Sequence, residues 1–250
     1  MLDNKKVIVF GAAGLLGFQL CQDILKQGAY LIAVDLDVEV LRDKFSSIAY
    51  ENCFELHGCN VNIDNDVQSI YKSYNNIDGV VNCVYPRNSS YGKHFYDVTI
   101  ENFNDNVSLN VGSSFLLMQT TAKYFRKYKN PVSFVNISSI YGVISPDFDI
   151  YKGTNMTMPV EYSAIKSAVL HMAKYIVSYV KNSDFRINSV SPGGLLDGQA
   201  SQFTEAYKAK TMGAGMLNVA DITGAVLFLL SEHSKYITGQ NIIVDDGFCL

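Results

Sequence analysis

The sequence has few of the features that mark nucleic-acid-binding and metal-binding proteins. Lysine and arginine number 20 against 24 aspartates and glutamates, a net charge of −4, and no basic block or stripe occurs. This charge pattern gives no reason to expect a nucleic acid as partner. The four histidines are scattered, and none stands at metal-ligand spacing from a cysteine, aspartate or glutamate. We therefore expect no metal site.

Cysteines and long apolar runs are also scarce. The five cysteines are odd in number and irregularly spaced, so neither a disulfide framework nor a zinc site is expected. A reducing cytoplasm fits this usage. The first apolar run, Val7–Phe10, is too short for a signal peptide, and ITGAVLFLLS at 222–231 is too short to cross a bilayer. We expect a cytoplasmic protein without a membrane span.

What the sequence does contain is a regular alternation of apolar runs and helical stretches. Hydrophobic residues make up 48% of the 250 residues, which permits a large core and argues against disorder. Short apolar runs predict strands at residues 5–10, 30–34, 53–58, 77–84, 132–138, 185–191 and 242–247. Helical spacing predicts helices at 15–26, 37–45, 67–74, 100–128, 160–181 and 219–231, the last with Asn218 as N-cap.

The predicted strands are apolar on both faces and are separated by helices. This pattern is typical of a parallel sheet that is covered on both sides. No linker-like change in composition divides the chain. The sequence therefore predicts one α/β domain over residues 1–250 with the doubly wound (Rossmann) fold, a three-layer sandwich around a seven-stranded parallel sheet.

A glycine-rich turn, GAAGLLG, joins the first strand to the first helix and contains Gly11, Gly14 and Gly17. Glycines at this place let a dinucleotide pyrophosphate rest on backbone N–H groups at a helix N-terminus, although a simple tight turn would have the same composition. Asp35 ends the second strand, 18 residues after Gly17. A carboxylate there accepts hydrogen bonds from the adenosine ribose and repels a 2′-phosphate, which favours NAD over NADP. A helix N-cap role for Asp35 is compatible with this one.

Tyr162 and Lys166 stand four residues apart and share one face of the predicted 160–181 helix. A free tyrosine has a pKa of about 10 and is a poor base at neutral pH, whereas a nearby ammonium stabilises the phenolate and lowers that pKa. A surface tyrosine beside a solvated lysine would show the same spacing. Position favours a site, because Ser138 and Ser139 end the preceding strand, where open α/β sheets bind ligands.

Eight segments in order make the chain resemble the short-chain dehydrogenase/reductase family over its whole length. They are GAAGLLG (11–17), Asp35, VNCV (81–84), LNVGSSF (109–115), NISSIYG (136–142), YSAIK (162–166), INSVSPGG (187–194) and YITGQNIIVDDG (236–247). The resemblance implies hydride transfer between the nicotinamide of NAD and a carbon that bears a hydroxyl or a ketone.

The resemblance also implies a role for each catalytic residue. Tyr162 would be the general acid/base, Ser139 would orient the substrate oxygen, and Lys166 would bind the nicotinamide ribose and tune Tyr162. Asn110 would hold a water that relays protons. We choose Ser139 over Ser138 because it stands three residues before a glycine, as the family serine does. The residues implied around NAD are Gly11, Ala13, Gly14, Leu15, Leu16, Asp35, Leu36, Asn60, Val61, Cys83, Val84, Tyr162, Lys166, Pro192, Gly193 and Leu195.

The chain departs from the family pattern at several of these places. The middle glycine of the turn comes one residue early, as in the longer nucleotide-sugar epimerases and dehydratases of the same superfamily. Asn82-Cys83-Val84-Tyr85 replaces the usual Asn-Asn-Ala-Gly, and Tyr85 is expected to crowd or reshape the nicotinamide side. Asn60 stands where an acid is usual, and Asp197 stands where a threonine is common.

Because of a long insertion, Tyr162 follows Ser139 by 23 positions, while the family gap is commonly about half of that. We interpret residues 143–159 as a substrate loop, since long loops in compact domains are often functional, and a plain surface loop is the alternative. The substrate candidates are Arg87, Tyr141, Tyr151, Asn155 and Met156. Residues 195–217, rich in small residues and methionine, match the family's mobile lid in position.

The amino-acid sequence of the insertion resembles that of a subgroup of these enzymes associated with bacterial surface-sugar and flagellin-modification loci. This indicates a small-molecule substrate, a sugar or sugar phosphate. Three alternatives stay open: a 3-oxoacyl-acyl-carrier-protein reductase, against which Asp35 argues; an epimerase or dehydratase that retains its NAD; and a non-catalytic NAD-binding scaffold or sensor. The resemblance further implies a homotetramer or homodimer formed through the two long helices and the C-terminal strand.

Overall fold

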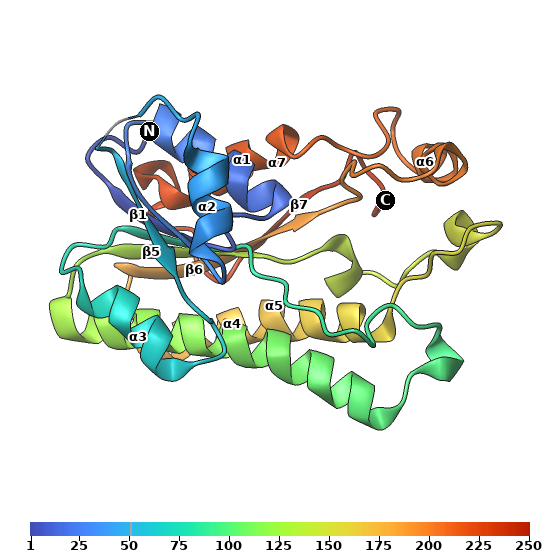
Figure 1. Cartoon of the computed structure of the whole chain (residues 1–250), viewed down its shortest axis with the longest axis horizontal. Coiled ribbons are helices and arrows are strands. Elements are labelled where there is room, and N and C mark those ends of the chain that lie inside the picture. The colour runs from blue at the N-terminus through green and yellow to red at the C-terminus, as the bar shows by residue number, and fades with distance from the viewer. Residues whose placement is uncertain (51) are drawn as a thin grey trace.

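The computed structural model of the chain describes residues 1–50 and 52–250 and contains a seven-stranded parallel sheet (Figure 1). The strands are β1 Lys6–Phe10, β2 Tyr30–Asp35, β3 Phe54–Gly58, β4 Gly79–Asn82, β5 Val132–Ile137, β6 Phe185–Pro192 and β7 Asn241–Val244. Their spatial order is β3-β2-β1-β4-β5-β6-β7, so the chain winds outward from the centre first in one direction and then in the other. The predicted doubly wound α/β fold is confirmed.

Helices cover both faces of this sheet (Figure 1). They are α1 Leu15–Lys26, α2 Val38–Phe45, α3 Asp64–Lys72, α4 Ile100–Tyr128, α5 Val160–Val180, α6 Ser201–Lys208 and α7 Ala220–Leu230, with short 3-10 helices η1 Phe95–Asp97, η2 Ile140–Gly142, η3 Phe148–Tyr151 and η4 Glu232–Ser234. Helices α1, α2 and α7 pack on one face, and α3, α4 and α5 pack on the other. Successive strand residues alternate between the two cores: Val7 and Val9 join the first, and Ile8 and Phe10 join the second.

Two strands end at least two residues earlier than predicted, because polar or left-handed residues turn the chain out of the sheet. Strand β4 stops at Asn82, whose side-chain oxygen accepts a hydrogen bond from the Val84 N–H at 3.1 Å. Strand β7 stops at Val244, because Asp246 (φ 51°) and Gly247 (φ 76°) adopt left-handed conformations that a strand does not allow. Both departures occur at the carboxyl edge of the sheet, where they free side chains for a site.

The predicted N-cap of α7 is wrong. The helix begins at Ala220 without a side-chain cap, and the Asn218 N–H instead donates to the Asp221 carboxylate at 2.8 Å. Asp221 in the first turn therefore reaches back to the chain before the helix, which is the reverse half of a capping box. Helix α3 also begins earlier than predicted, at Asp64.

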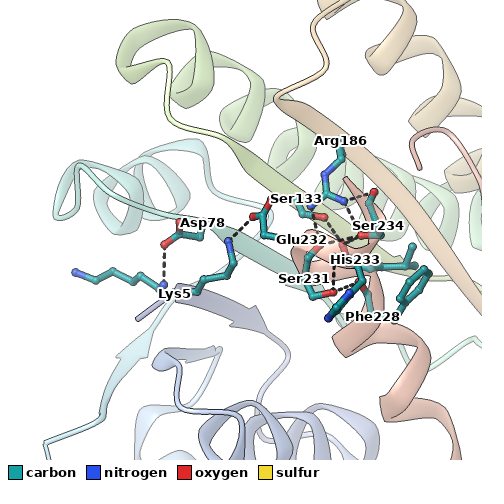
Figure 2. Close-up of polar contacts among 11 residues, drawn as sticks. Lys5, Asp78, Ser133, Arg186, Phe228, Ser231, Glu232, His233 and Ser234 are labelled. Carbon is teal, nitrogen blue, oxygen red and sulfur yellow. Dashed lines mark hydrogen bonds and ion pairs between the residues drawn. The ribbon is translucent and has the colours of Figure 1, made fainter. Parts of the chain in front are cut away.

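A polar network ties the amino end of the sheet to the end of α7 (Figure 2). The Arg186 guanidinium, near the start of β6, donates to the backbone oxygens of Ser231 and Ser234. Lys5, which precedes β1, forms an ion pair with Glu232 at 2.8 Å. Arg186 is buried, so these acceptors satisfy a guanidinium that would otherwise be costly to desolvate. These contacts attach the amino end of the sheet to the segment that follows α7.

Candidate active site

A cleft of about 740 Å³ opens at the carboxyl ends of the central strands. Its walls are the Gly-rich turn, the segment after β4, the end of β5, the start of α5 and the segment after β6. The insertion before α5 and helix α6 lie at this same end of the molecule (Figure 1). Open α/β sheets bind their ligands at this edge.

Each of the three positions in the turn favours glycine for a different structural reason. Gly11 has φ +80°, and a Cβ there would lie 2.9 Å from the Cys83 carbonyl carbon. A Cβ on Gly17 would lie 2.0 Å from the Gly11 oxygen, so only glycine lets α1 pack on the turn. A Cβ on Gly14 would meet just that same oxygen, at 3.3 Å, among the described residues. Gly14 therefore keeps space open on the cleft side, which it lines.

Gly14 is also the N-cap of α1, and this helix has neither a side-chain cap nor an acid in its first turn among the residues described. The first N–H groups of any helix lack intrahelical acceptors and favour an anion. The open space at Gly14 and the uncapped helix end thus fit the pyrophosphate of a dinucleotide.

Asp35 lies at the end of β2 and holds the Gly-rich turn. Its carboxylate accepts hydrogen bonds from the Ala13 N–H at 2.8 Å and from the Leu36 N–H at 2.7 Å. The N-cap of α2 is Asp37, which accepts from the Glu39 N–H, so Asp35 does not have the alternative helix-capping role.

Only part of the expected cofactor set lines the cleft itself. The lining residues of that set are Gly14, Leu15, Leu16, Cys83, Tyr162, Lys166, Pro192, Gly193 and Leu195. Asn60 and Val61 follow β3, farther along the same edge, and Asn60 is engaged with the Asn62 N–H and with Asp66. The cofactor candidates thus extend from the cleft along the carboxyl edge toward β2 and β3.

Ser139 and Tyr162 meet in the cleft although 22 residues separate them in the chain, positions 140–161. Ser139 follows β5, and its hydroxyl accepts a hydrogen bond from the Tyr141 N–H at 3.2 Å. Tyr162 lies in the first turn of α5. Burial raises the pKa of Tyr162, and the neighbouring Ser139 hydroxyl partly offsets this.

The expectation that Lys166 lowers the pKa of Tyr162 is not met, because burial dominates. Lys166 Nζ lies 5.6 Å from the centre of the Tyr162 ring and donates to the Ile137 oxygen at 3.0 Å. Burial also lowers the pKa of Lys166, to about 8. A lysine with this pKa is close to titrating at neutral pH, which is typical of catalytic groups.

The two serines after β5 are used differently. The Ser138 hydroxyl donates to the Lys166 backbone oxygen at 3.1 Å and so fastens α5 to the sheet. Asn110, on α4, is buried, and its amide donates to the Pro86 and Asn106 oxygens at 2.8 and 3.0 Å. In this structure Asn110 holds the segment after β4 and is not among the residues that line the cleft.

The segment after β4 brings aromatic and basic side chains to the cleft. Tyr85 stands edge-on against the Tyr162 ring, with ring centres 5.3 Å apart. Arg87 is exposed, and its guanidinium carbon lies 5.9 Å from the centre of the Tyr91 ring. All four residues line the cleft. Nothing in the local sequence pattern had indicated Tyr91, which lies in a long loop without regular periodicity.

The insertion and the 195–217 segment pack against each other over the cleft. Tyr151 contacts Phe203 of α6, with ring centres 5.1 Å apart, and Asp147 forms an ion pair with Lys210 at 2.9 Å. Asn155 and Met156 line the cleft, as do Tyr141 and Tyr151. Further lining residues were missed from the sequence because tertiary packing alone brings them there; they are Gln199, Phe203, Tyr207 and Met216.

Comparison with known proteins identifies the family. A family model described as enoyl-(acyl carrier protein) reductase matches residues 11–249. Post-translational flagellin modification protein A of Campylobacter coli is 34% identical, over 100% of both chains. The chain belongs to the short-chain dehydrogenase/reductase family.

Solved structures agree with this assignment. A short-chain dehydrogenase from Leptospira borgpetersenii with bound NAD+ is 31% identical, covers 100% of this chain and 94% of its own, and superposes with a TM-score of 0.87. The 7α-hydroxysteroid dehydrogenase of Bacteroides fragilis is 26% identical over 99% of this chain and 95% of its own. The resemblance inferred from the eight motifs is confirmed, and this short-chain dehydrogenase/reductase is an oxidoreductase.

Two further features bear on what this short-chain dehydrogenase/reductase contains. Within residues 1–50 and 52–250, no cluster of three or more histidines, cysteines and acids is placed to hold a metal ion. In the same part of the chain, no helix combines the length and the apolar character needed to cross a membrane.

Proposed function

We propose that the protein uses NAD(H) to interconvert a secondary alcohol and a ketone on a sugar or sugar phosphate, in the cytoplasm of a bacterium that makes surface glycans. The observation that carries the proposal is the meeting of Ser139, Tyr162 and Lys166 in one cleft beside the Gly-rich turn. A hydroxyl, a phenol and an ammonium there can orient a carbonyl oxygen and exchange one proton with it.

The cofactor supplies the hydride chemistry when it is bound, and the side chains of the chain manage the proton. In the reductive direction the Tyr162 phenol donates its proton to the substrate oxygen, and in the oxidative direction the phenolate accepts it. The raised pKa of Tyr162 keeps the phenol protonated at neutral pH, which is the form that the reductive direction needs. Ser139 donates a hydrogen bond to the same oxygen, and Lys166 places a positive charge near the phenolate that forms. Asn110 is assigned the family role of holding a water that relays protons. It lies on α4, and its amide donates to the Pro86 oxygen.

The preference for NAD over NADP is proposed from Asp35. Its carboxylate lies at the end of β2 and is fixed there by two backbone N–H groups. A 2′-phosphate at this place would meet a negative charge, whereas ribose hydroxyls would find an acceptor. The other proposed contacts with NAD come from the Gly-rich turn, Leu36, Asn60–Val61, Cys83–Val84 and Pro192–Leu195.

The substrate class is proposed from the cleft and from the relative in flagellin modification. Tyr141, Tyr151, Asn155 and Met156 offer ring faces, a carboxamide and a thioether around the position that faces Tyr162. Rings and amides of this kind suit the apolar faces and the hydroxyls of a sugar. Arg87, exposed at the rim, supplies a cation for a phosphate or carboxylate.

Assembly into a homodimer or homotetramer is proposed through α4 and α5. A second hollow, of about 730 Å³, lies along these helices and is lined by Phe115, Tyr175 and Tyr179 among others. These three side chains are 45%, 65% and 80% exposed, which is more aromatic surface than an isolated chain usually leaves in water. Light scattering coupled to size-exclusion chromatography tests this part of the proposal.

The test of the activity is absorbance at 340 nm with NAD+ or NADH and two substrate panels. One panel holds sugars and sugar phosphates, and the other holds acyl-pantetheines. Turnover confined to the sugar panel supports the proposal, and turnover confined to the acyl panel replaces it with the acyl reductase alternative. Binding of NADH without turnover on either panel would favour a scaffold or sensor, and NAD that copurifies would favour an epimerase or dehydratase.

A further inference from the structure

Tyr85 stands where the family usually has glycine, and its ring lies at the centre of the proton-transfer site. The Lys166 Nζ is 4.7 Å from the centre of the Tyr85 ring, which is nearer than the 5.6 Å to the Tyr162 ring. The Tyr162 ring meets Tyr85 edge-on, at 5.3 Å and 76°. One aromatic side chain thus contacts both members of the pair that the proposed function uses.

The Tyr85 ring is itself held in place. Its hydroxyl donates to the Tyr91 hydroxyl at 2.9 Å, and the two rings stand 5.7 Å apart at 80°. The Asn110 amide fixes the next residue, since it donates to the Pro86 oxygen. Tyr85 is therefore a fixed wall of the cleft, not a free surface tyrosine.

An aromatic face stabilises an ammonium within about 6 Å of its centre, more strongly where water is excluded. Lys166 is buried, 7% exposed, and has one backbone acceptor, the Ile137 oxygen. Burial works against its charge and lowers its pKa to about 8. The Tyr85 face acts in the opposite direction, because it favours the charged form.

We propose that Tyr85 is a positioning residue that keeps Lys166 charged and directed at Tyr162, in place of the glycine that the family usually has there. The inference rests on the proposed function, since it assigns Tyr85 a role through Tyr162 and Lys166.

Few other groups around Lys166 change charge in the pH range of interest. Cys83, directly after β4, and Tyr91 both have pKa values raised to about 12 by burial, and burial raises the pKa of Tyr85 further still. The remaining titratable or charged groups that face this cluster are Arg87, Tyr151, Glu161 and Tyr162. The charge of Lys166 is therefore expected to decide the alkaline limb of the activity profile.

The test compares Tyr85→Phe, which keeps the ring, with Tyr85→Leu, which keeps an apolar side chain without a π face. The pKa of Lys166 is measured in the free protein by NMR of ¹³C-labelled lysine, with the signal assigned by its loss in Lys166→Met. Loss of the π face is expected to lower this pKa by about half to one and a half pH units. Tyr85→Phe is expected to leave it unchanged. Tyr96→Leu, on an almost fully exposed tyrosine, is the control.

The alkaline limb of kcat should move to lower pH by the same amount in Tyr85→Leu, with KM changed less than kcat. If the leucine variant does not fold, Tyr85→Met serves in its place, since methionine fills irregular space. An unchanged Lys166 pKa in the leucine or methionine variant overturns the inference, and so does an equal fall in Tyr85→Phe. The proposed function fails separately, if Tyr162→Phe and Lys166→Met retain turnover.

Discussion

Replacing Lys166 with methionine is expected to stabilise the fold while it removes activity. The side chain is buried on α5, and burial lowers its pKa from the ordinary 10.5 to about 8. One pKa unit corresponds to about 1.4 kcal/mol, so holding this lysine charged costs the folded state roughly 3 kcal/mol. Methionine has similar length and no charge, which removes that cost.

The gain in folding stability from Lys166→Met depends on pH. Its sign follows from the protons that Lys166 binds in the folded and unfolded chains. The unfolded chain keeps the lysine proton up to about pH 10.5, whereas the folded chain releases it near pH 8. Stability of the wild-type protein therefore rises with pH between these two values, as the penalty is relieved. The advantage of Lys166→Met is greatest below pH 8 and shrinks toward pH 10. Loss of the hydrogen bond to the Ile137 oxygen offsets about 1 kcal/mol of it.

The assay is urea unfolding of the cofactor-free protein at pH 7 and at pH 10, followed by far-ultraviolet circular dichroism. We expect a net gain of about 1 to 2 kcal/mol at pH 7 and less at pH 10. Lys174→Met, an exposed lysine on the same helix, is the matched control and should change stability by less than about 0.5 kcal/mol. A loss of stability at pH 7, or a gain that is equal at both pH values, would refute the reasoning.

Further substitutions test other parts of the site. Asp35→Asn keeps an acceptor but removes the charge, so the ratio of kcat/KM for NAD over NADP should fall by roughly tenfold to several hundredfold; an unchanged ratio would count against Asp35. Gly17→Ala would place a Cβ 2.0 Å from a backbone oxygen and should lower Tm, whereas Gly14→Ala should keep Tm and weaken NADH binding measured by fluorescence. Asp147→Asn breaks the half-exposed ion pair with Lys210 and should raise substrate KM by roughly twofold to fivefold with little change in Tm. An equal effect of both glycine substitutions on Tm, or an unchanged KM in Asp147→Asn, would contradict those two predictions.

Much of the fold could be predicted because its cause is local in the sequence. The five inner strands of the sheet are buried on both faces, so apolar runs such as Val7–Phe10 stand out. The long helices at 100–128 and 160–180 carry apolar residues at helical spacing. The boundaries that were missed depend on single polar groups. The Asn82 side chain ends β4, and the Asp221 carboxylate reaches the Asn218 N–H before α7.

The candidate site was predictable in part for a different reason. Ser139, Tyr162 and Lys166 come from a strand end and the following helix, and the topology of a parallel sheet brings those two places together. The direction of the Tyr162 pKa was not predictable, because it depends on how deeply the whole fold buries the phenol. The contact of Tyr85 with Lys166 could not be predicted from the spacing of residues in the sequence, because Tyr85 follows β4 and Lys166 lies on α5.

The most direct test of the central claim is the turnover of NADH with a sugar or sugar-phosphate ketone by wild-type protein and by Tyr162→Phe. The two proteins should bind NADH with dissociation constants within about threefold, since the phenol makes a minor part of the cofactor site. Wild-type protein should turn over, and the variant should be slower by roughly a hundredfold or more, the usual contribution of a general acid. Undiminished turnover in Tyr162→Phe would contradict the account.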